Sequence, residues 1–286
     1  MELNTFFARH PVFRIEEVDM FLKEREISLT DGRVDAAKRQ ALLTYHQRLG
    51  HILRLRQGLY ASVPPGNDAK TYPVDSFLIA SRLTSDFVLA YHTALSLLGV
   101  AHSVREEFLG LSEQKHTRPL RYNNTLYYVT SPPAALSEPD RMLIGVTERS
   151  RQGLTVRVTD WERTIVDSLD RLALAGGWNE VWRSLESIEV YLNLDFLIDY
   201  TQRLNNTATC AKVGYFLEQH REQFSVRERH LDRLRVQHPL QPYYVERNKN
   251  ISLRSGHSRR FIPQWNIWIP VEKSEYALEF DKDLYV

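Results

Sequence analysis

Cysteine and long apolar runs are scarce in this sequence of 286 residues. The one cysteine, Cys210, has no second cysteine to pair with, which excludes an internal disulfide and a cysteine-rich zinc site. No stretch approaches the roughly 18 apolar residues that a membrane span needs. Glu2, Asn4 and Arg9 stand where a signal peptide has an unbroken apolar run. We therefore expect a soluble, cytoplasmic protein with no membrane partner.

A strong excess of one charge is also lacking. Lys and Arg number 37 and Asp and Glu number 36, so the net charge of +1 indicates no partner, and any nucleic-acid signal must come from local clustering. Hydrophobic residues make up 43% and charged residues 26%, which is typical of a globular protein. A glycine-rich phosphate loop is absent, since Gly176 and Gly177 follow a predicted helix instead of preceding one.

The clearest boundary lies at residues 63–70, VPPGNDAK, where two prolines, a glycine and polar residues indicate a linker. We predict a DNA-binding domain over residues 1–66 and a larger mixed domain over residues 71–286. The fold class that follows is α+β, an N-terminal winged helix-turn-helix before a mixed α/β C-terminal domain.

The first domain is predicted to contain two helices and a hairpin. Helical spacing of apolar residues predicts a helix over 14–26, and a second helix over 35–50 ends at Gly50. Residues 28–33 are predicted to form a turn. Residues 51–63 alternate and contain Gln57-Gly58, which predicts a β-hairpin with a two-residue turn. A helix followed by a short basic hairpin is the order of a winged helix-turn-helix.

The predicted recognition helix has an apolar side formed by Leu42, Leu43, His46 and Leu49. The opposite side carries small and polar residues, namely Ala36, Gln40, Thr44, Gln47 and Arg48. Glutamine can bond adenine and arginine can bond guanine in the major groove. The alternative is an ordinary surface helix, which has the same pattern.

Basic residues cluster around this helix and the hairpin. Between residues 31 and 60 two acids, Asp31 and Asp35, oppose six basic residues, which are Arg33, Lys38, Arg39, Arg48, Arg54 and Arg56. We expect Arg54 and Arg56 to share one hairpin face, with Leu53 and Leu55 on the other. The alternative is an edge hairpin that charge protects from aggregation.

The interface predicted from these patterns has two parts. Base edges are assigned to Gln40, Thr44, Gln47 and Arg48. The DNA backbone is assigned to Lys38, Arg39, Arg54 and Arg56, with Gln57 at the hairpin turn.

The second domain is predicted to mix helices and strands. A helix is expected over 73–83, a strand leading into a helix over 87–99, strands between 106 and 133 and from Leu154, and a helix over 161–177 that a Thr159–Glu162 capping box begins. At least three more helices follow to about residue 238, and strands return near the C-terminus.

A second basic zone lies between residues 225 and 260. Three acids, Glu228, Asp232 and Glu246, oppose nine basic residues, namely Arg227, Arg229, Arg233, Arg235, Arg247, Lys249, Arg254, Arg259 and Arg260. This zone could be a second nucleic-acid surface or a docking face for an acidic partner or the acidic tail over 272–283. It could also be an ordinary solvated face.

Catalytic signals are weak. Asp160, Glu162, Asp167 and Asp170 crowd one helix, but helix capping and an Arg163–Asp167 ion pair explain them better than metal binding. His92 is interpreted as a buried, hydrogen-bonded residue and Cys210 as a core residue. We therefore expect no enzyme activity, no catalytic residue, no cofactor and no bound metal.

Several phrases of the sequence resemble one protein family. LLTYHQRLGHILRLRQGLYASVPPG, FLIASRL, LAYHTALSLLGVA and RVTDWERTIVDSLDRLALAGG occur in that order. They are similar to the AbiEi family of antitoxins from abortive-infection toxin–antitoxin systems, clearly over residues 13–214 and more weakly beyond residue 239.

The resemblance implies a repressor of its own operon that binds double-stranded operator DNA. It also implies an antitoxin that counters a co-encoded nucleotidyltransferase-type toxin in phage defence, with the toxin or its gene product as a partner. A monomer and a homodimer both remain open. Three alternatives remain: a stand-alone regulator without a toxin, a nucleic-acid-processing enzyme that the winged helix targets, and a protein-binding module.

Overall fold

The computed structural model describes residues 2–27, 29–30, 33–114, 118–137, 141–246 and 258–271. The fold is mixed α+β, and the chain divides into two compact units that interleave along the sequence. The first unit comprises residues 1–93, 105–132 and 146–159, and the second comprises residues 94–104, 133–145 and 160–286. The predicted domain boundary at residues 66–71 stays a prediction.

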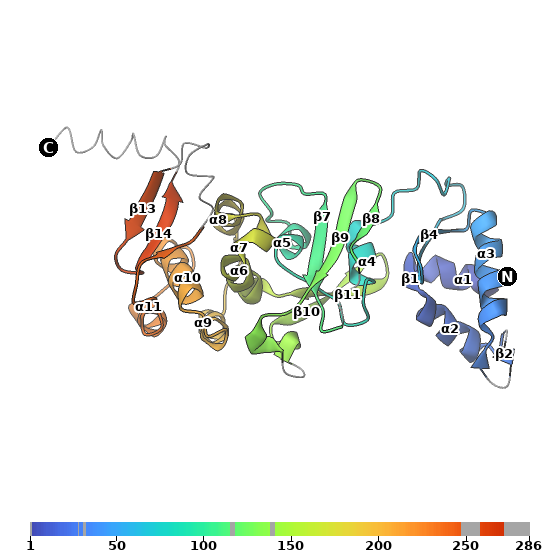
Figure 1. The fold of residues 1–286 in the computed structure, drawn as a ribbon, viewed down its shortest axis with the longest axis horizontal. Coiled ribbons are helices and arrows are strands. Elements are labelled where there is room, and N and C mark those ends of the chain that lie inside the picture. Colours follow the sequence, from blue (N-terminus) through green and yellow to red (C-terminus); the bar gives the residue numbers. More distant parts are fainter. Residues whose placement is uncertain are drawn as a thin grey trace. The chain divides into compact units, whose positions relative to one another are not determined.

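The N-terminal segment of the first unit contains three helices, α1 (Glu2–Arg9), α2 (Ile15–Glu24) and α3 (Ala36–Arg48) (Figure 1). A three-stranded antiparallel sheet has the order β1-β5-β4 and consists of β1 (Val12–Arg14), β4 (Ile52–Arg56) and β5 (Leu59–Ser62). β2 (Leu29–Thr30) and β3 (Arg33–Val34) pair where residues 28–33 were predicted to form a turn, so short strands occupy part of that stretch, and residues 28, 31 and 32 lie outside the described residues.

One apolar cluster holds these helices and strands together. Its buried members are Leu3, Phe6, Phe7, Phe13, Val18, Leu22, Leu43, Ile52 and Tyr60. The sequence patterns predicted α2, α3 and the β4–β5 hairpin, and the structure confirms all three. The sequence patterns did not predict α1. The rings of its Phe6 and Phe7 meet edge to face, and both pack against Phe13.

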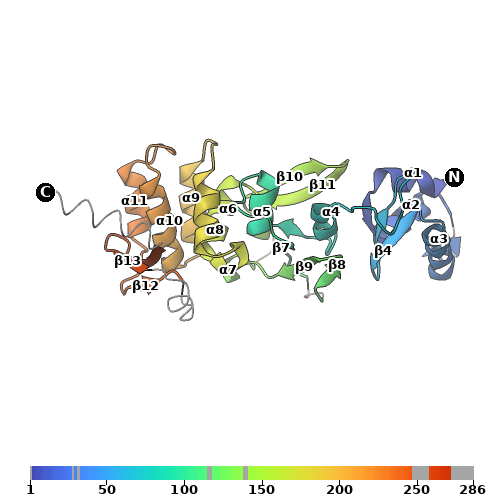
Figure 2. The same ribbon diagram turned by 90° about the horizontal axis from the view of Figure 1, so that it is seen from above.

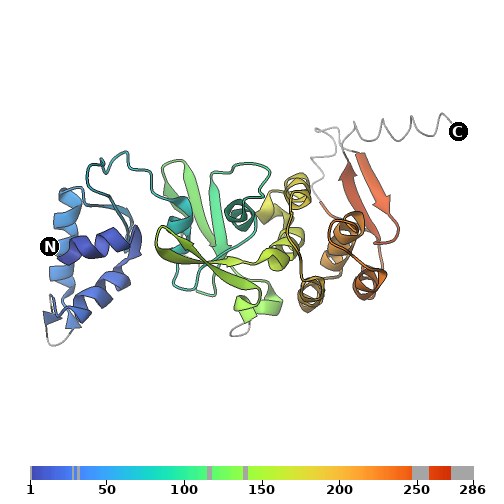
Figure 3. The ribbon, with the colours of Figure 1, turned by 180° about the vertical axis from the view of Figure 1, so that it is seen from behind.

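The first unit also contains a six-stranded mixed sheet, drawn in green in Figure 3. Its strand order is β10-β11-β6-β7-β9-β8. Its strands are β6 (Val88–Leu89), β7 (Glu107–Leu111), β8 (Leu120–Tyr122), β9 (Thr125–Thr130), β10 (Val146–Arg151) and β11 (Leu154–Thr159). Gly110 on β7 leaves no room for a side chain, because a Cβ there would lie 2.2 Å from the Val88 carbonyl oxygen. Helix α4 (Ser76–Ser81) contacts this sheet, and α5 (His92–Leu98) follows β6.

The second unit is mainly helical. Its helices are α5 from Ala94 onward, α6 (Trp161–Asp170), α7 (Leu172–Ala175), α8 (Trp178–Glu186), α9 (Leu194–Arg203), α10 (Thr207–Gln219) and α11 (Glu228–Arg235), with 3-10 turns at Ala134–Leu136 and Arg141–Leu143. Figure 2 shows α9, α10 and α11 side by side, and each contacts the other two. The strands β12 (Tyr243–Tyr244), β13 (Ser258–Ile262) and β14 (Ile267–Val271) form a sheet in the order β12-β14-β13.

The start of α6 differs from the prediction. Asp160, and not Thr159, is the N-cap, and its carboxylate accepts the Arg163 backbone N–H at 2.8 Å. The helix also ends earlier than predicted, because the backbone leaves the helical conformation at Arg171, between α6 and α7. A short side chain whose oxygen can accept a backbone N–H of the first turn makes a good N-cap, and aspartate serves as well as threonine.

A buried ion pair anchors α6 within the second unit. Arg163 Nε lies 3.0 Å from Asp167 Oδ2, and neither side chain is exposed to solvent. The same guanidinium donates to the carbonyl oxygens of Met142 and Ile144, and the Tyr200 hydroxyl donates to Asp167 at 2.7 Å. The i,i+4 pair predicted from the sequence is confirmed, and these extra hydrogen bonds offset the cost of burying two charges.

Within the part of the chain that the structure describes, no helix has the length and apolar character to cross a membrane.

Candidate nucleic-acid interface

Helix α3 has well-defined ends. The Asp35 carboxylate caps its first turn by accepting the backbone N–H groups of Ala37 at 2.8 Å and Lys38 at 3.1 Å. Gly50 follows the last turn with a φ of +73°, a conformation that glycine adopts without strain. The predicted glycine at the helix end is confirmed.

Only a narrow stripe of α3 packs against the core. Leu43 is buried, and Arg39, Leu42 and His46 are half-buried. The prediction that Leu49 belongs to this side is wrong, since its side chain is 50% exposed. The helix therefore presents most of its circumference to solvent.

The predicted base-reading side of α3 faces solvent. Ala36, Gln40, Gln47 and Arg48 are exposed, and Thr44 is half-buried. The Gln40 side-chain amide lies 3.4 Å from the Thr44 hydroxyl, which is close to the limit for a hydrogen bond. Residues at this spacing lie on one helix face, so their polar groups are available to an external partner. Tyr45, which the sequence did not single out, is also 59% exposed.

The two basic residues at the start of α3 differ from each other. Lys38 is exposed, and its ammonium lies 3.9 Å from the Asp35 carboxylate. Arg39 forms an ion pair with Asp19 of α2 at 2.5 Å, and only 19% of its side chain is exposed. Arg39 therefore ties α3 to α2, and Lys38 is the residue of the two that faces solvent.

The hairpin confirms the predicted Gln57-Gly58 turn, in which Gly58 has a φ of +78°. Its strands do not alternate as expected. Leu55 is buried as predicted, but Leu53 is only half-buried, and Ile52 joins the core instead. A shift of register between Arg54 and Arg56 breaks the regular two-residue alternation.

The hairpin arginines also have different surroundings. Arg54 is exposed, with a long contact of 3.4 Å from its Nε to the Arg56 carbonyl oxygen. Arg56 is half-buried and donates to the Leu83 carbonyl oxygen at 2.6 Å. Burial, together with the charge of Arg14, lowers the pKa of Arg56. Arg54 and the exposed Gln57 thus form the accessible part of the predicted hairpin contact.

Between residues 33 and 60, three exposed guanidiniums have no ion-pair partner among the described residues. They belong to Arg33 on β3, Arg48 at the end of α3 and Arg54 on β4. Unpaired surface cations retain their charge for an external anion, such as a phosphate group.

Two histidines meet at the C-terminal end of α3. The Nδ1 atoms of His46 and His51 are 3.1 Å apart, so one ring donates and the other accepts. His46 also packs edge-on against Phe7 of α1 at 4.9 Å. Burial and the neighbouring His51 lower the pKa of His46, so this contact favours the neutral ring.

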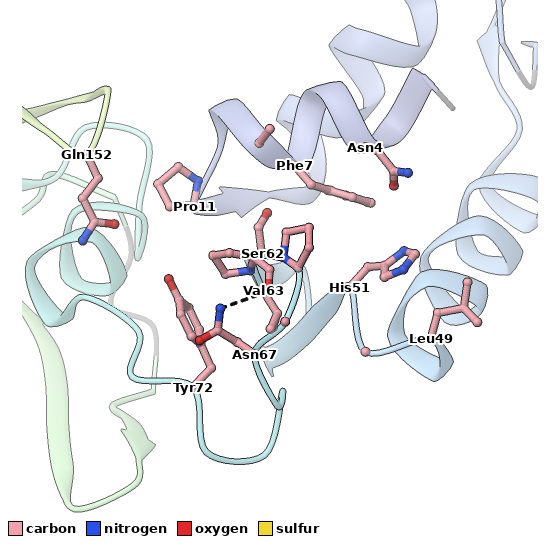
Figure 4. Close-up of a pocket in the computed structure, with 15 residues that line it drawn as sticks. Asn4, Phe7, Pro11, Leu49, His51, Ser62, Val63, Asn67, Tyr72 and Gln152 are labelled. Carbon is pink, nitrogen blue, oxygen red and sulfur yellow. Dashed lines mark hydrogen bonds between the residues drawn. The ribbon is translucent and has the colours of Figure 1, made fainter.

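A cavity of about 720 Å³ lies in the first unit beside this end of α3 (Figure 4). Phe7, Leu49, His51, Val63 and Tyr72 line it, and none of the described residues in the lining is Asp, Glu, Lys or Arg. With no such charged side chain, this cavity does not extend the basic surface of α3 and the hairpin.

The second basic zone is neutralised only in part. Arg233 pairs with Asp195 and Asp199, and Arg235 pairs with Glu228, Asp232 and Glu218. Arg259 lies over the Tyr244 ring at 5.0 Å, and Arg260 is half-buried on the same strand. Arg227 and Arg229 remain exposed. Arg247, Lys249, Arg254 and the acidic tail over 272–283 lie outside the described residues.

The four acids on α6 have structural contacts. Asp160 caps the helix, and Glu162 accepts the Asn193 backbone N–H at 2.6 Å. Asp167 pairs with Arg163, and Asp170 accepts hydrogen bonds from Thr209 and Asn206. Among the described residues no group of three metal-ligating side chains could hold a metal ion.

His92 and Cys210 are both buried, as predicted. Burial raises the pKa of the Cys210 thiol to about 11, so the thiol stays protonated at neutral pH.

No family model matches the chain, and no curated protein matches it in sequence. Among solved structures the chain is similar to the crystal structure of the RV2827C protein from Mycobacterium tuberculosis, at 16% identity and a TM-score of 0.52. The match covers 94% of this chain and 90% of the other. At this identity the likeness concerns the fold alone.

Proposed function

We propose that this protein is a sequence-specific binder of double-stranded DNA whose N-terminal segment is a winged helix-turn-helix. The observation that carries the proposal is the exposed polar face of α3, together with the guanidiniums of Arg48 and Arg54, which form no ion pair with any residue that the structure describes. The order of the segment supports it, since three helices are followed by a hairpin in a three-stranded sheet. In this interpretation α2 and α3 form the helix-turn-helix, and β4–β5 is the wing.

In the proposed complex α3 enters the major groove. Gln40, Thr44, Gln47 and Arg48 contact base edges, where amide and guanidinium groups distinguish adenine and guanine. Lys38, Arg54 and Gln57 contact the DNA backbone, which sets position and orientation without reading sequence. Arg39 and Arg56 are engaged within the protein, so they hold α3 and the hairpin in place.

The resemblance to AbiEi antitoxins supports two cellular roles for this DNA binding, repression of its own operon and action as an antitoxin. A protein bound at its own promoter would exclude RNA polymerase and repress the operon. The second unit would then serve the antitoxin role toward a co-encoded toxin. Repression of a reporter that carries the region upstream of this gene, and rescue of cells that express the product of the adjacent reading frame, test these two roles separately.

The DNA-binding proposal is tested by titrating the protein against its upstream DNA and against an unrelated duplex. We expect Arg54→Ala to weaken both duplexes similarly and to reduce the slope of log K against log salt by about 1, because one phosphate contact is lost. Gln47→Ala should instead weaken the upstream DNA more than the unrelated duplex, because a base contact is lost.

Arg203→Ala is the matched control, since Arg203 is an exposed arginine at the end of α9 in the second unit. This variant should bind like the unaltered protein. Unchanged binding in both Arg54→Ala and Gln47→Ala would contradict the assignment of the interface.

A further inference from the structure

A second cavity, of about 410 Å³, lies in the second unit where the starts of α9 and α11 meet. Tyr191 and Asn193 line it before α9, and Arg227, Arg229 and His230 line it from α11. The volume is in the range of small-molecule sites, roughly 300–1,000 Å³. Neither the proposed DNA interface nor the buried Arg163–Asp167 pair includes any of these residues.

The charge of this cavity is positive and uncompensated. Arg227 and Arg229 are exposed and form no ion pair with any residue that the structure describes. The one carboxylate in the lining, Asp195, is already engaged by Arg233 at 2.8 Å. An anion that enters the cavity therefore meets two available guanidiniums.

The surroundings of His230 independently indicate that this cavity can receive a hydrogen-bond acceptor from a ligand. Its side chain is almost fully buried, at 6% exposure. The Arg227 backbone N–H lies 3.1 Å from its Nδ1, and the Arg229 Nε–H lies 3.3 Å from its Nε2. A neutral imidazole can accept only one of these two donors, because its other nitrogen carries a proton.

Of the two donors, we expect the Arg227 backbone N–H to form the hydrogen bond with the His230 ring. The Arg227 N–H has no other acceptor among the described residues, whereas the Arg229 side chain can turn. His230 then accepts at Nδ1, and its Nε2–H faces a guanidinium N–H. Two donors that face each other repel, and an oxygen that accepts from both would satisfy them.

The third element is an aromatic ring. Tyr191 is 94% exposed and belongs to the same lining. Exposed aromatic rings beside cationic grooves stack nucleobases, whichever base is present. A carboxylate from an acidic peptide would satisfy the donors but would leave this ring without a partner.

We propose that this cavity binds a nucleotide unit, either free or within a single strand. Arg227, Arg229 and the His230 Nε2–H hold the phosphate oxygens, and the Tyr191 ring stacks on the base. The site lies in the second unit and does not depend on the proposed winged helix.

The proposal is tested by isothermal titration of the full chain with ATP, inorganic phosphate and a ten-nucleotide thymidine strand. The strand is titrated into a background that carries Arg48→Gln and Arg54→Gln, so that binding at the proposed DNA interface does not contribute. ATP and the strand together distinguish a free nucleotide from a nucleic acid.

We expect Arg229→Gln to weaken ATP or the strand about tenfold, as the loss of a charged hydrogen bond does. Arg227→Gln should act in the same direction. Tyr191→Ala should weaken ATP and the strand but leave the affinity for inorganic phosphate unchanged, because only the stacking contact is lost. Arg203→Gln, which removes the same charge from the other end of α9, should change none of these affinities.

Several results would overturn the proposal. They are no binding of any probe, equal losses in Arg229→Gln and the Arg203→Gln control, and no effect of either cavity arginine. Tighter binding of a glutamate-rich peptide than of ATP, with the same sensitivity to Arg229→Gln, would assign the cavity to an acidic protein partner instead. All of these results are independent of the outcome of the upstream-DNA titration.

Discussion

Helix α3 and the C-terminal half of α11 are both rich in basic residues, yet the structure uses their charges differently. Arg48 of α3 and the nearby Arg54 are exposed and form no ion pair among the described residues. Arg233 and Arg235 of α11 are each held by two or more carboxylates. An excess of basic residues along the sequence therefore indicates a binding surface only where those residues lack carboxylate partners in the fold.

Arg163 represents a third environment, in which the arginine and its carboxylate are both fully buried. An arginine in this protein can thus be exposed without an ion pair among the described residues, paired at the surface, or paired in the core. The expected consequence of removing it or its partner differs in kind between these environments, and the following predictions use that difference.

The largest expected effect concerns the buried pair. Asp167→Asn keeps the hydrogen bond with Tyr200 but leaves the Arg163 charge uncompensated, so we expect the free energy of unfolding to fall by about 3–5 kcal/mol. Urea denaturation measures it. An Arg163→Met/Asp167→Leu double variant leaves no buried charge, so its free energy of unfolding should fall by less than that of Asp167→Asn. An equal or greater fall would show that the ion pair itself stabilises the fold, beyond each charge neutralising the other.

The next effect separates binding from stability. Arg48→Gln should cost about 1–3 kcal/mol of binding free energy for the cognate duplex, the range for a lost base contact, with little change in unfolding. Arg235→Gln should leave DNA binding unchanged, because its guanidinium is occupied by Glu228, Asp232 and Glu218. Fluorescence anisotropy and thermal melts of both variants check this. A loss of DNA affinity in Arg235→Gln would remove the distinction between the two helices.

The contributions to stability of Asp160, at the start of α6, and of His46, on α3, should change with pH in opposite directions. Burial raises the pKa of Asp160 from 3.8 to about 6, so the folded state holds this proton more tightly, and the contribution of Asp160 to stability falls as the pH rises between these values. The pKa of His46 is lowered from 6.5, so its contribution is present above pH 6.5 and is lost as the pH falls below it.

Urea midpoints from pH 4 to pH 8 test both contributions. Asp160→Asn retains a capping oxygen, so it should gain stability relative to the unaltered protein as the pH rises to 6. His46→Gln should reduce the loss of stability below pH 6.5. Parallel pH profiles for the variants and the unaltered protein would show that neither group titrates as expected.

The smallest effect is expected at the surface of α11. Arg233→Gln removes two ion pairs whose carboxylates are each 64% exposed, so the free energy of unfolding should change by about 0–1 kcal/mol. Chemical denaturation in low and high salt measures it, and the difference from the unaltered protein should shrink in high salt. A loss as large as that of Asp167→Asn would mean that surface pairing on α11 is a structural requirement.

Local sequence patterns predicted much of the fold. The α3 helix, its terminal glycine and the Gln57-Gly58 hairpin turn depend on backbone conformations that neighbouring residues determine. The same holds for the i,i+4 pair of Arg163 and Asp167, since one helix turn brings them together. The polar face of α3 was likewise predictable, because helical spacing defines it before any partner packs.

Contacts between distant parts of the chain were not predictable in this way. Nothing local indicates that Arg39 meets Asp19, that Arg56 reaches Leu83, or that Ile52 replaces Leu53 in the core. The cavity beside His230 likewise forms only because α9 and α11 pack together.

The sequence by itself determined α2, α3, the β4–β5 hairpin and the stretches where basic residues concentrate. Only the tertiary structure decided which of those charges are neutralised and which face solvent. The physical reason is that backbone geometry acts over a few residues, whereas an ion pair such as Arg233 with Asp195 joins positions 38 residues apart that come together only when the helices pack.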